Sequence, residues 1–507
     1  MPSPEYLKNS TREIEDLSCA YSEEMIAVIA QELVGLKDGM SEKEFQEFLL
    51  KSSDTINEEV LKKLAIYTGV SAEVIKKAVQ DAGKEVIREN SEISEAAGKG
   101  KVALSKEMES ALGSIERAAI RETVTLAGTT AISSQDSFAI AATQARNDIL
   151  AGNRSYSQAI VSAVRQAAAR GTVVYYPSGH RDKIEVAMRR TVLSAVNAES
   201  GGLILLSCRE VGCGYVETTA HAGARPTHAV WQGRVFKLEG TAPGYENFYE
   251  ATGYGTGAGL CGWNCRHSFH MFFPGVSLPA YSKAMLQDYD VPKYVWEGEE
   301  YTDYECSQIQ RGYERKIRES RRVLIGYESA RKGVTEENLR EELTRSFQEE
   351  SARLKRIEKE LKEFCKQTGR YVESSRLFTV SRQSGSVEHF NRSISQKAVH
   401  ANKAVTNPLK NGIIKTDKQF GKKIGKHAAD FGLDPSKEAD RKKMNQIIDD
   451  IVNHADEIRV GQWRGQTGEC KFYIKGSDVV VANGDIFVTI LKGGLENSGR
   501  VKNARKL

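Results

Sequence analysis

The sequence predicts a multidomain protein with a mainly helical N-terminal region, an α+β region, a long charged helix and a small C-terminal α+β domain. Its 507 residues are too many for one hydrophobic core. Apolar residues recur with helical spacing as far as residue 170, and four strand-like segments lie near the end of the chain. The expected parts are 1–170, 171–300, 301–370 and 413–507, with a linker at 371–412.

The composition narrows the class of protein. Charged residues make up 28% of the chain, hydrophobic residues 40%, and there are only 10 prolines, which excludes a disordered or fibrous protein. No apolar run approaches the roughly 20 residues that cross a bilayer, so we expect no membrane partner. Eight cysteines without regular spacing predict reduced thiols rather than a disulfide scaffold.

Region 1–170 carries two helix-start signals. Ser41 and Glu44 have the spacing of a capping box directly before an apolar segment. Ser71 has the position of a second N-cap, followed by apolar residues on one helical face at Val74, Ile75, Ala78 and Val79. We therefore expect separate helices to begin at these two serines.

Region 171–300 departs from helical spacing. Gly171 is expected to end a helix, residues 173–176 to form a strand, and Pro177-Ser178-Gly179 to break it. The segments LILLS (203–207) and AVWQGRVF (229–236) are expected to be short strands between glycine-rich loops. This pattern predicts a compact α+β region.

Region 301–370 is rich in Arg, Glu and Lys. Its apolar residues are spaced alternately about four and three residues apart, and Glu350 occupies one position of this pattern. The apolar positions are Leu343, Phe347, Leu354, Ile357, Leu361 and Phe364. One long helix is expected. A solvated spacer and a short coiled coil between subunits both remain open.

A loop rich in cysteine and histidine lies within the α+β region. Residues that can bind zinc lie in this loop at Cys261, Cys265, His267 and His270, and upstream of it at Cys208, Cys213, His221 and His228. The expected ligands are Cys261, Cys265, His267 and His221, although the spacing is not that of paired Cys-x2-Cys sites. A catalytic Cys-His pair is one alternative. Another is a small aromatic core without chemistry, made of Trp263, Phe269, Phe272 and Phe273. No other cofactor is expected.

Three motifs in this part of the chain carry a family resemblance. They are TAHAGARPTHAVWQGRVF (219–236), GYGTGAGLCGWNCRHSFHMFFPG (253–275) and YECSQIQRGYERKIRESRRVL (304–324). Residues 1 to about 370 resemble the phage minor capsid protein 2 family. The resemblance implies a structural role in head morphogenesis and a place in the virion near the portal, after synthesis in the bacterial cytoplasm. It also implies portal and other capsid proteins as partners, and assigns no chemistry to the Cys/His loop.

The C-terminal part of the chain is basic. Residues 376–507 hold 24 Lys and Arg against 14 Asp and Glu, which favours a polyanionic partner. A helix over MNQIIDDIV precedes four expected strands, and Asn483-Gly484 predicts a hairpin between the last two. We expect one helix packed on a four-stranded antiparallel sheet.

The segment KQFGKKIGKHAADFGLD and this order of elements resemble nuclease toxins of the barnase-EndoU-colicin-RelE superfamily, over about residues 415–507. The resemblance implies metal-independent cleavage of RNA by its own 2′-hydroxyl, and a possible immunity protein as partner. His427 is expected to transfer protons, with His454 as its rival. Phosphate stabilisation and hydroxyl donation are expected from Arg459, Arg464, Lys471, Tyr473 and Thr489.

A second hypothesis for the same region is binding without cleavage. A set of basic residues is expected to form an electrostatic surface that holds RNA or packaged DNA. Its members are Lys422, Lys423, Lys426, Arg500, Lys502 and Arg505. A purely structural head protein with such a nucleic-acid clamp stays open beside the ribonuclease.

Overall fold

The computed structural model describes residues 9–373, 377, 380–383, 386–389, 392–406, 413, 415, 417–464, 466, 469–483 and 486–506. The chain divides into two compact units, residues 1–396 and 397–507. The expected boundaries near residues 170 and 300 do not separate units, because the helical region, the α+β region and the charged helices pack together in the first one.

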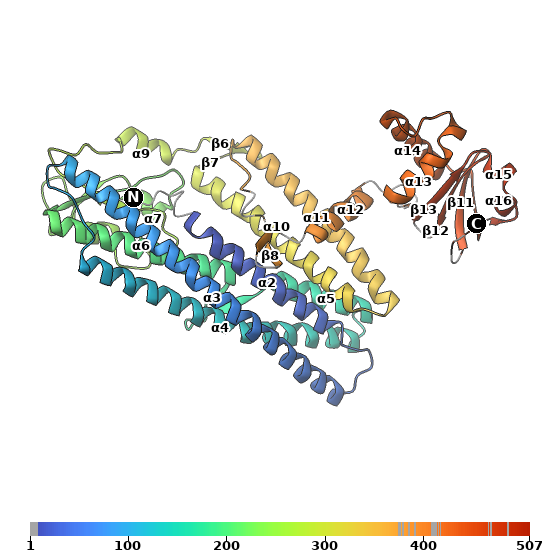
Figure 1. Ribbon diagram of the computed structural model, residues 1–507, viewed down its shortest axis with the longest axis horizontal. Helices are drawn as coiled ribbons and strands as arrows, with labels where there is room; N and C mark the ends of the chain where they lie inside the picture. The colour runs from blue at the N-terminus through green and yellow to red at the C-terminus, as the bar shows by residue number, and fades with distance from the viewer. Residues whose placement is uncertain are drawn as a thin grey trace. The chain divides into compact units, whose positions relative to one another are not determined.

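Long helices build the first unit, and Figure 1 shows them running side by side. They are α2 (Arg12–Leu33), α3 (Glu42–Ala96), α4 (Lys106–Leu150), α5 (Tyr156–Arg170), α6 (Ile184–Val211), α10 (Asp303–Gly333) and α11 (Glu337–Gln367). The capping box of Ser41 and Glu44 is present at the start of α3. The helix start expected at Ser71 is wrong, because the buried face through Val74 and Val79 continues one unbroken helix of 55 residues.

The central helix of this unit is α6, which packs against α2, α3 and α4. Within the described part of the chain it is the one helix long and apolar enough to cross a membrane, yet 72% of its most apolar window is buried inside the protein. The strand expected at 203–207 is wrong, because these residues belong to α6. A short apolar run has the same pattern in a buried strand and in a buried helix.

Glu199 of α6 predicts a dependence of stability on pH. Burial, assisted by Glu116, raises the pKa of Glu199 to about 9, and neither carboxyl oxygen has a hydrogen-bond partner. The folded state therefore keeps a proton that the unfolded state loses above its ordinary pKa. The free energy of unfolding should fall by up to about 1.4 kcal/mol per pH unit between pH 5 and pH 8.

The expected result is that Glu199→Gln flattens this slope, because glutamine carries no titrating proton. Thermal melting of the full chain from pH 5 to pH 8 measures it. Exposed Glu95→Gln on α3 is the matched control. Parallel pH profiles for Glu199→Gln and the unmodified protein would contradict the prediction.

Small sheets and short helices connect the long helices. The strands are β1 (Val173–Tyr175), β2 (Arg181–Lys183), β3 (Tyr215–Thr218), β4 (Val235–Lys237), β5 (Phe269–Met271), β6 (Tyr294–Trp296) and β7 (Glu299–Tyr301). The short helices are α7 (Pro226–Ala229), α8 (Phe248–Thr252) and α9 (Lys283–Tyr289). Strands β4, β3 and β5 form an antiparallel sheet in that order. Gly171 ends α5 with a φ of 58°, and β1 follows as expected.

The charged region folds as a helical hairpin rather than one long helix. Helices α10 and α11 are separated by residues 334–336, where Val334 has an extended backbone. They pack against each other and against α5. The apolar face from Leu343 to Phe364 is buried within the chain, so neither a solvated spacer nor a coiled coil between subunits describes it.

Part of the expected linker is structured. Strands β8 (Val380–Gln383) and β9 (Ser386–His389) pair antiparallel, and α12 (Arg392–Thr406) follows. Strand β8 lies against α2. Residues 407–412 of the expected linker lie outside the described residues.

The second unit has an antiparallel sheet in the order β13-β12-β11-β10-β14. Its strands are β10 (Glu457–Gln462), β11 (Glu469–Lys475), β12 (Asp478–Asn483), β13 (Ile486–Leu491) and β14 (Arg505–Lys506). Its helices are α13 (Asp417–His427), η2 (Ala429–Phe431), α14 (Glu438–Asn453), α15 (Gly494–Asn497) and α16 (Gly499–Lys502). The four expected strands are present, β14 is a fifth, and β12 pairs with β13 as the hairpin predicts, although Gly484 lies outside the described residues.

Both faces of this sheet are buried. One face packs against α13 and α14 through residues such as Tyr473, Val480 and Ile490. The other face is covered by residues that include Trp463, Leu495 and Val501. Residues at the centre of strands β11 and β12, such as Phe472, Tyr473, Val480 and Val481, are therefore core residues.

Candidate metal centre

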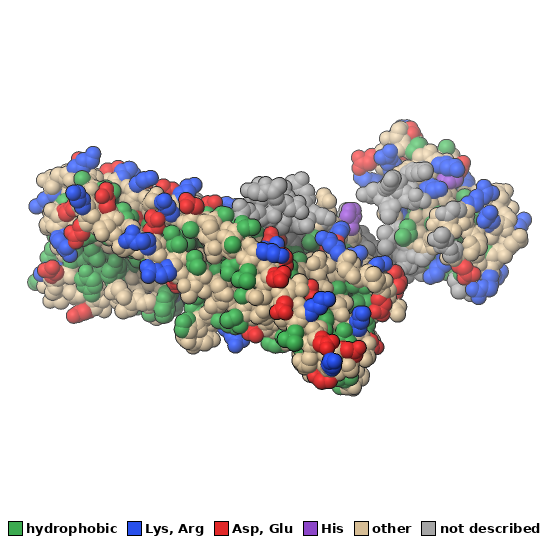
Figure 2. Space-filling model, turned by 60° about the horizontal axis from the view of Figure 1, so that its bottom comes forward, with side chains coloured by type: hydrophobic (Ala, Val, Ile, Leu, Met, Phe, Trp, Pro, Cys, Tyr) green, Lys and Arg blue, Asp and Glu red, His purple; other side chains and the backbone are tan. Residues whose placement is uncertain are grey.

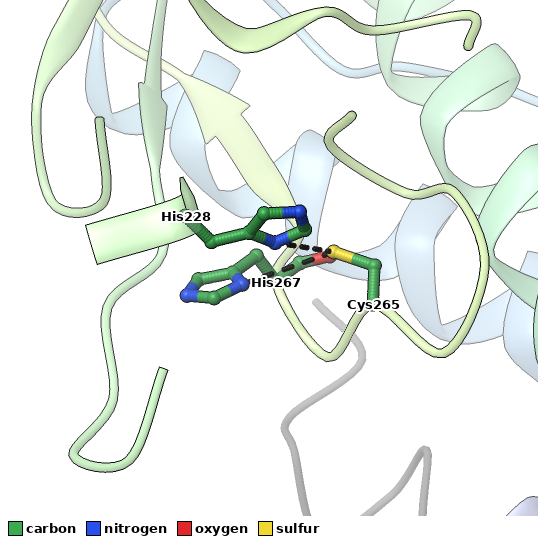
Figure 3. Close-up of side chains that lie close together, drawn as sticks. All are labelled: His228, Cys265 and His267. Carbon is green, nitrogen blue, oxygen red and sulfur yellow. Dashed lines mark hydrogen bonds between the residues drawn. The ribbon is translucent and has the colours of Figure 1, made fainter. Parts of the chain in front are cut away.

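Three buried side chains from two segments meet in the α+β region (Figure 3). His228 lies on α7, whereas Cys265 and His267 lie in the loop between α8 and β5. Cys265 Sγ is 3.7 Å from His228 Nδ1 and 3.8 Å from His267 Nδ1. One ligand atom from each residue lies within 4.8 Å of the other two, so their geometry suits a common cation.

Glycines give the loop its shape. A Cβ on Gly259 would lie 2.0 Å from the carbonyl oxygen of Gly253, and one on Gly262 would lie 2.4 Å from that of Gly257. Cys261 adopts a φ of 60°, which is uncommon for a residue with a side chain. Backbone therefore packs on backbone, and the tight turns direct Cys265 and His267 inward.

Short-range features position His228. Pro226 stands at the first turn of α7, where its fixed φ suits a helix start. The Arg225 side chain donates to the backbone carbonyl of Trp263 across a distance of 2.6 Å, which ties this turn to the Cys/His loop. The two segments are thus joined independently of the cluster itself.

Both histidines are oriented through their outer ring nitrogens. His228 Nε2 lies 2.9 Å from the carbonyl oxygen of Ala258, and His267 Nε2 lies 3.1 Å from Gln232 Oε1. The same Gln232 oxygen accepts the backbone N–H of His221 at 3.1 Å. Both Nε2 atoms therefore donate, so in the neutral rings each Nδ1 presents a lone pair to Cys265.

The buried surroundings of the cluster favour the neutral forms of its histidines and its thiol. Burial, together with His221 and His228, lowers the pKa of His267 to about 2, and burial also lowers the pKa of His228. Burial raises the pKa of the Cys265 thiol. A catalytic thiolate-imidazolium pair needs the opposite directions, so these pKa shifts disfavour a Cys-His nucleophile at this site.

The expected ligand set is only partly assembled. Cys265 and His267 are brought together, whereas His221 stacks on His267 with ring centroids 4.3 Å apart and Cys261 Sγ contacts the His267 carbonyl at 3.7 Å. Neither belongs to the group within 4.8 Å. His228, which lies among the upstream candidates in the sequence, takes the place that was expected for His221.

The aromatic residues of the loop region differ in their burial. Phe269, Phe272 and Phe273 are buried, as a small core requires. Trp263 is 60% exposed and does not belong to that core, since its ring covers Gly257 at the surface. The aromatic core therefore exists beside the Cys/His cluster rather than instead of it.

A comparison with protein-family models matches residues 3–366 to the model described as phage minor capsid protein 2. The chain belongs to the phage minor capsid protein 2 family. No curated protein and no solved structure matches it. Membership supports a structural role in head morphogenesis, a location in the virion, and other capsid or head proteins as partners.

The family match of this phage minor capsid protein ends at residue 366, before its second unit. The expected nuclease residues lie in that second unit. Tyr473 is 2% exposed and packs on the α13/α14 side of the sheet, opposite Val480 and Ile490 in register. Thr489 is also 2% exposed and is paired with Val481 on the other side. The two hydroxyls expected in one site therefore lie on opposite faces.

The remaining expected catalytic residues lie on several elements of the second unit. Arg459 pairs with Glu457 at 2.6 Å and donates to the Lys502 carbonyl at 2.7 Å, which makes it part of the sheet edge. Arg464 and Lys471 are exposed. His427 ends α13 and pairs with Asp430 at 3.1 Å, while its rival His454 is 61% exposed and pairs with Asp450.

The expected basic surface residues are mostly accessible. Lys426, Arg500, Lys502 and Arg505 are exposed, and Arg505 lies 3.9 Å from Glu469. Lys423 is half-buried on α13. Lys422 is in the same helix, but its side chain lies outside the described residues.

Proposed function

We propose that this phage minor capsid protein is a structural head component near the portal whose second unit binds nucleic acid. The proposal that this unit binds nucleic acid rests on its excess of positive charge. Residues 397–507 form a compact unit with 21 Lys and Arg against 13 Asp and Glu. Such an excess on a folded domain attracts phosphate backbones irrespective of sequence.

Six of these cations lie at one end of the sheet. We call it the basic edge, and it is formed by residues on or beside β10, β11, β14 and α16, namely Arg464, Lys471, Arg500, Lys502, Arg505 and Lys506. Figure 2 shows Lys and Arg side chains on the surface of this unit. Glu457 and Glu469 neutralise part of this charge through Lys506 and Arg505. Within the described part of this unit, no ion pair involves the other four cations, which are exposed.

The expected result is that Arg464→Ser/Arg500→Ser/Lys502→Ser weakens binding of the full chain to double-stranded DNA, because these three exposed residues belong to the basic edge. Each lost phosphate contact reduces the slope of log K against log salt by about 0.9, hence by about 2.7 for three. Fluorescence anisotropy with a labelled duplex across a salt series measures this slope. The matched control is Lys43→Ser/Lys62→Ser/Lys84→Ser on α3, where the lysines are exposed. Equal slopes for both variants and the unmodified chain would refute the proposal.

One observation supports ribonuclease activity as a second candidate. Asp430 faces His427 Nδ1, an arrangement that leaves Nε2 to accept a proton, and Lys426 is the exposed neighbour. Cleavage also needs a second proton-transfer group and a cation close by. Tyr473 and Thr489 do not supply the second proton-transfer group, because both are core residues and lie on opposite faces of the sheet.

Incubation of the full chain with RNA and a chelator separates the two candidates. Binding without cleavage predicts intact RNA. Degradation that His427→Ala abolishes would replace the binding proposal with the metal-independent ribonuclease and would add RNA as substrate. His454→Ala is the control, because this residue has the same kind of aspartate partner at another position.

A further inference from the structure

We propose that His228, Cys265 and His267 bind a zinc ion, with Cys261 as the fourth ligand. The ion would be structural, because the three clustered side chains are at most 2% exposed, whereas a catalytic zinc ion keeps one position open to water or substrate. It would join α7 to the loop before β5, segments 37 residues apart at His228 and Cys265.

The hydrogen-bond inventory of the cluster favours a cation. Ala258 O and Gln232 Oε1 only accept hydrogen bonds, so both histidines are protonated on Nε2 and both Nδ1 atoms need a donor. Cys265 offers one S–H proton to these two acceptors. One buried nitrogen would stay unsatisfied, whereas a metal ion at the centre satisfies both nitrogens and the sulfur.

The distances suit tetrahedral zinc. Bonds of about 2.3 Å to sulfur and about 2.0–2.1 Å to nitrogen place these atoms about 3.5 Å apart around the ion. The two sulfur-nitrogen distances are 3.7 and 3.8 Å, so only small shifts are required. The outer hydrogen bonds to a carbonyl and an amide oxygen are those that orient histidine ligands in metal sites.

Cys261 is favoured over His221 as the fourth ligand. A metal lies close to the plane of each imidazole that binds it, and the His221 and His267 rings are stacked with an interplanar angle of 25°, so they cannot share an ion in this arrangement. Cys261 Sγ and Cys265 Sγ both lie near the His267 carbonyl oxygen, at 3.7 and 3.8 Å. Two thiolates also balance the charge of Zn²⁺ in a buried site, which one thiolate does not.

The metal content of the full chain tests the proposal directly. Protein purified without added metal is expected to contain one zinc ion per chain by elemental mass spectrometry. Removal of the ion with a chelator should lower the melting temperature, and Zn²⁺ but not Mg²⁺ should restore it. A zinc-free chain whose melting temperature does not respond to Zn²⁺ would overturn the proposal without any substitution.

Substitutions then test the ligands. His228→Ala and Cys265→Ser should abolish retention of zinc, whereas Cys213→Ser and His270→Ala should retain it, since these residues have other partners. Cobalt substituted for zinc should show thiolate absorption that decreases in Cys261→Ser. Unchanged absorption in that variant would overturn the assignment of Cys261, and zinc retained by Cys265→Ser would overturn the site.

Discussion

Gly259→Ala is expected to destabilise the first unit by about 4 kcal/mol, the largest effect of any substitution considered for this chain. The new methyl group would lie 2.0 Å from the Gly253 carbonyl oxygen and 2.8 Å from the Thr252 carbonyl oxygen. Both are backbone atoms, and the Leu260 N–H donates to Thr252 in the same turn. Relief therefore requires the loop that carries Cys265 and His267 to move.

Thermal or denaturant unfolding of the full chain measures this effect. Gly255→Ala is the matched control in the same loop. Gly255 has a φ of 90° but no atom within 4 Å of the added Cβ, so it should show only backbone strain of about 1–2 kcal/mol. Equal destabilisation by the two substitutions would mean that positive φ, and not close backbone packing, constrains this loop.

Arg165→Ala is expected to cost about 3 kcal/mol, although Arg165 is 45% exposed. Its guanidinium donates to Glu350 Oε2 at 2.7 Å, which joins α5 to α11, and the Glu350 side chain on α11 is 1% exposed. Arg353 holds the other carboxylate oxygen at 2.7 Å. Truncation of Arg165 leaves a buried charge with one partner in place of two.

Unfolding of the single and double variants by denaturant tests this explanation. Arg165→Met/Glu350→Met should recover most of the loss, because a buried apolar pair needs no counter-charge. Arg345→Ala, which removes the exposed ion pair with Glu342 on the same helix, should have no measurable effect. A double variant less stable than Arg165→Ala would show that the ion pair itself stabilises the hairpin.

Much of this architecture follows from local sequence. The capping box at Ser41 and Glu44 starts a helix, and the buried positions from Val74 to Val79 lie on the expected face. The strands β10 to β13 are where alternation and the Asn483-Gly484 turn predict them. These features depend on residues a few positions apart, so the chain encodes them without reference to distant segments.

The local pattern was insufficient wherever burial depends on a distant partner. Residues 203–207 read as a strand because apolar runs are ambiguous, and only their packing among α2, α3 and α4 makes them part of α6. Glu350 interrupts an apolar stripe, and its place in the core is explained by Arg165, 185 residues away.

The sequence by itself determined the family, through three ordered motifs, and the kinds of side chain available at the Cys/His loop. Only the tertiary structure brought His228 to Cys265 and His267 in place of His221, and put Tyr473 and Thr489 on opposite faces of one sheet. The physical reason is the same in both cases. Spacing along the chain restricts which residues can share a helix or strand, whereas a site is made by contacts between segments that the packing of whole elements selects.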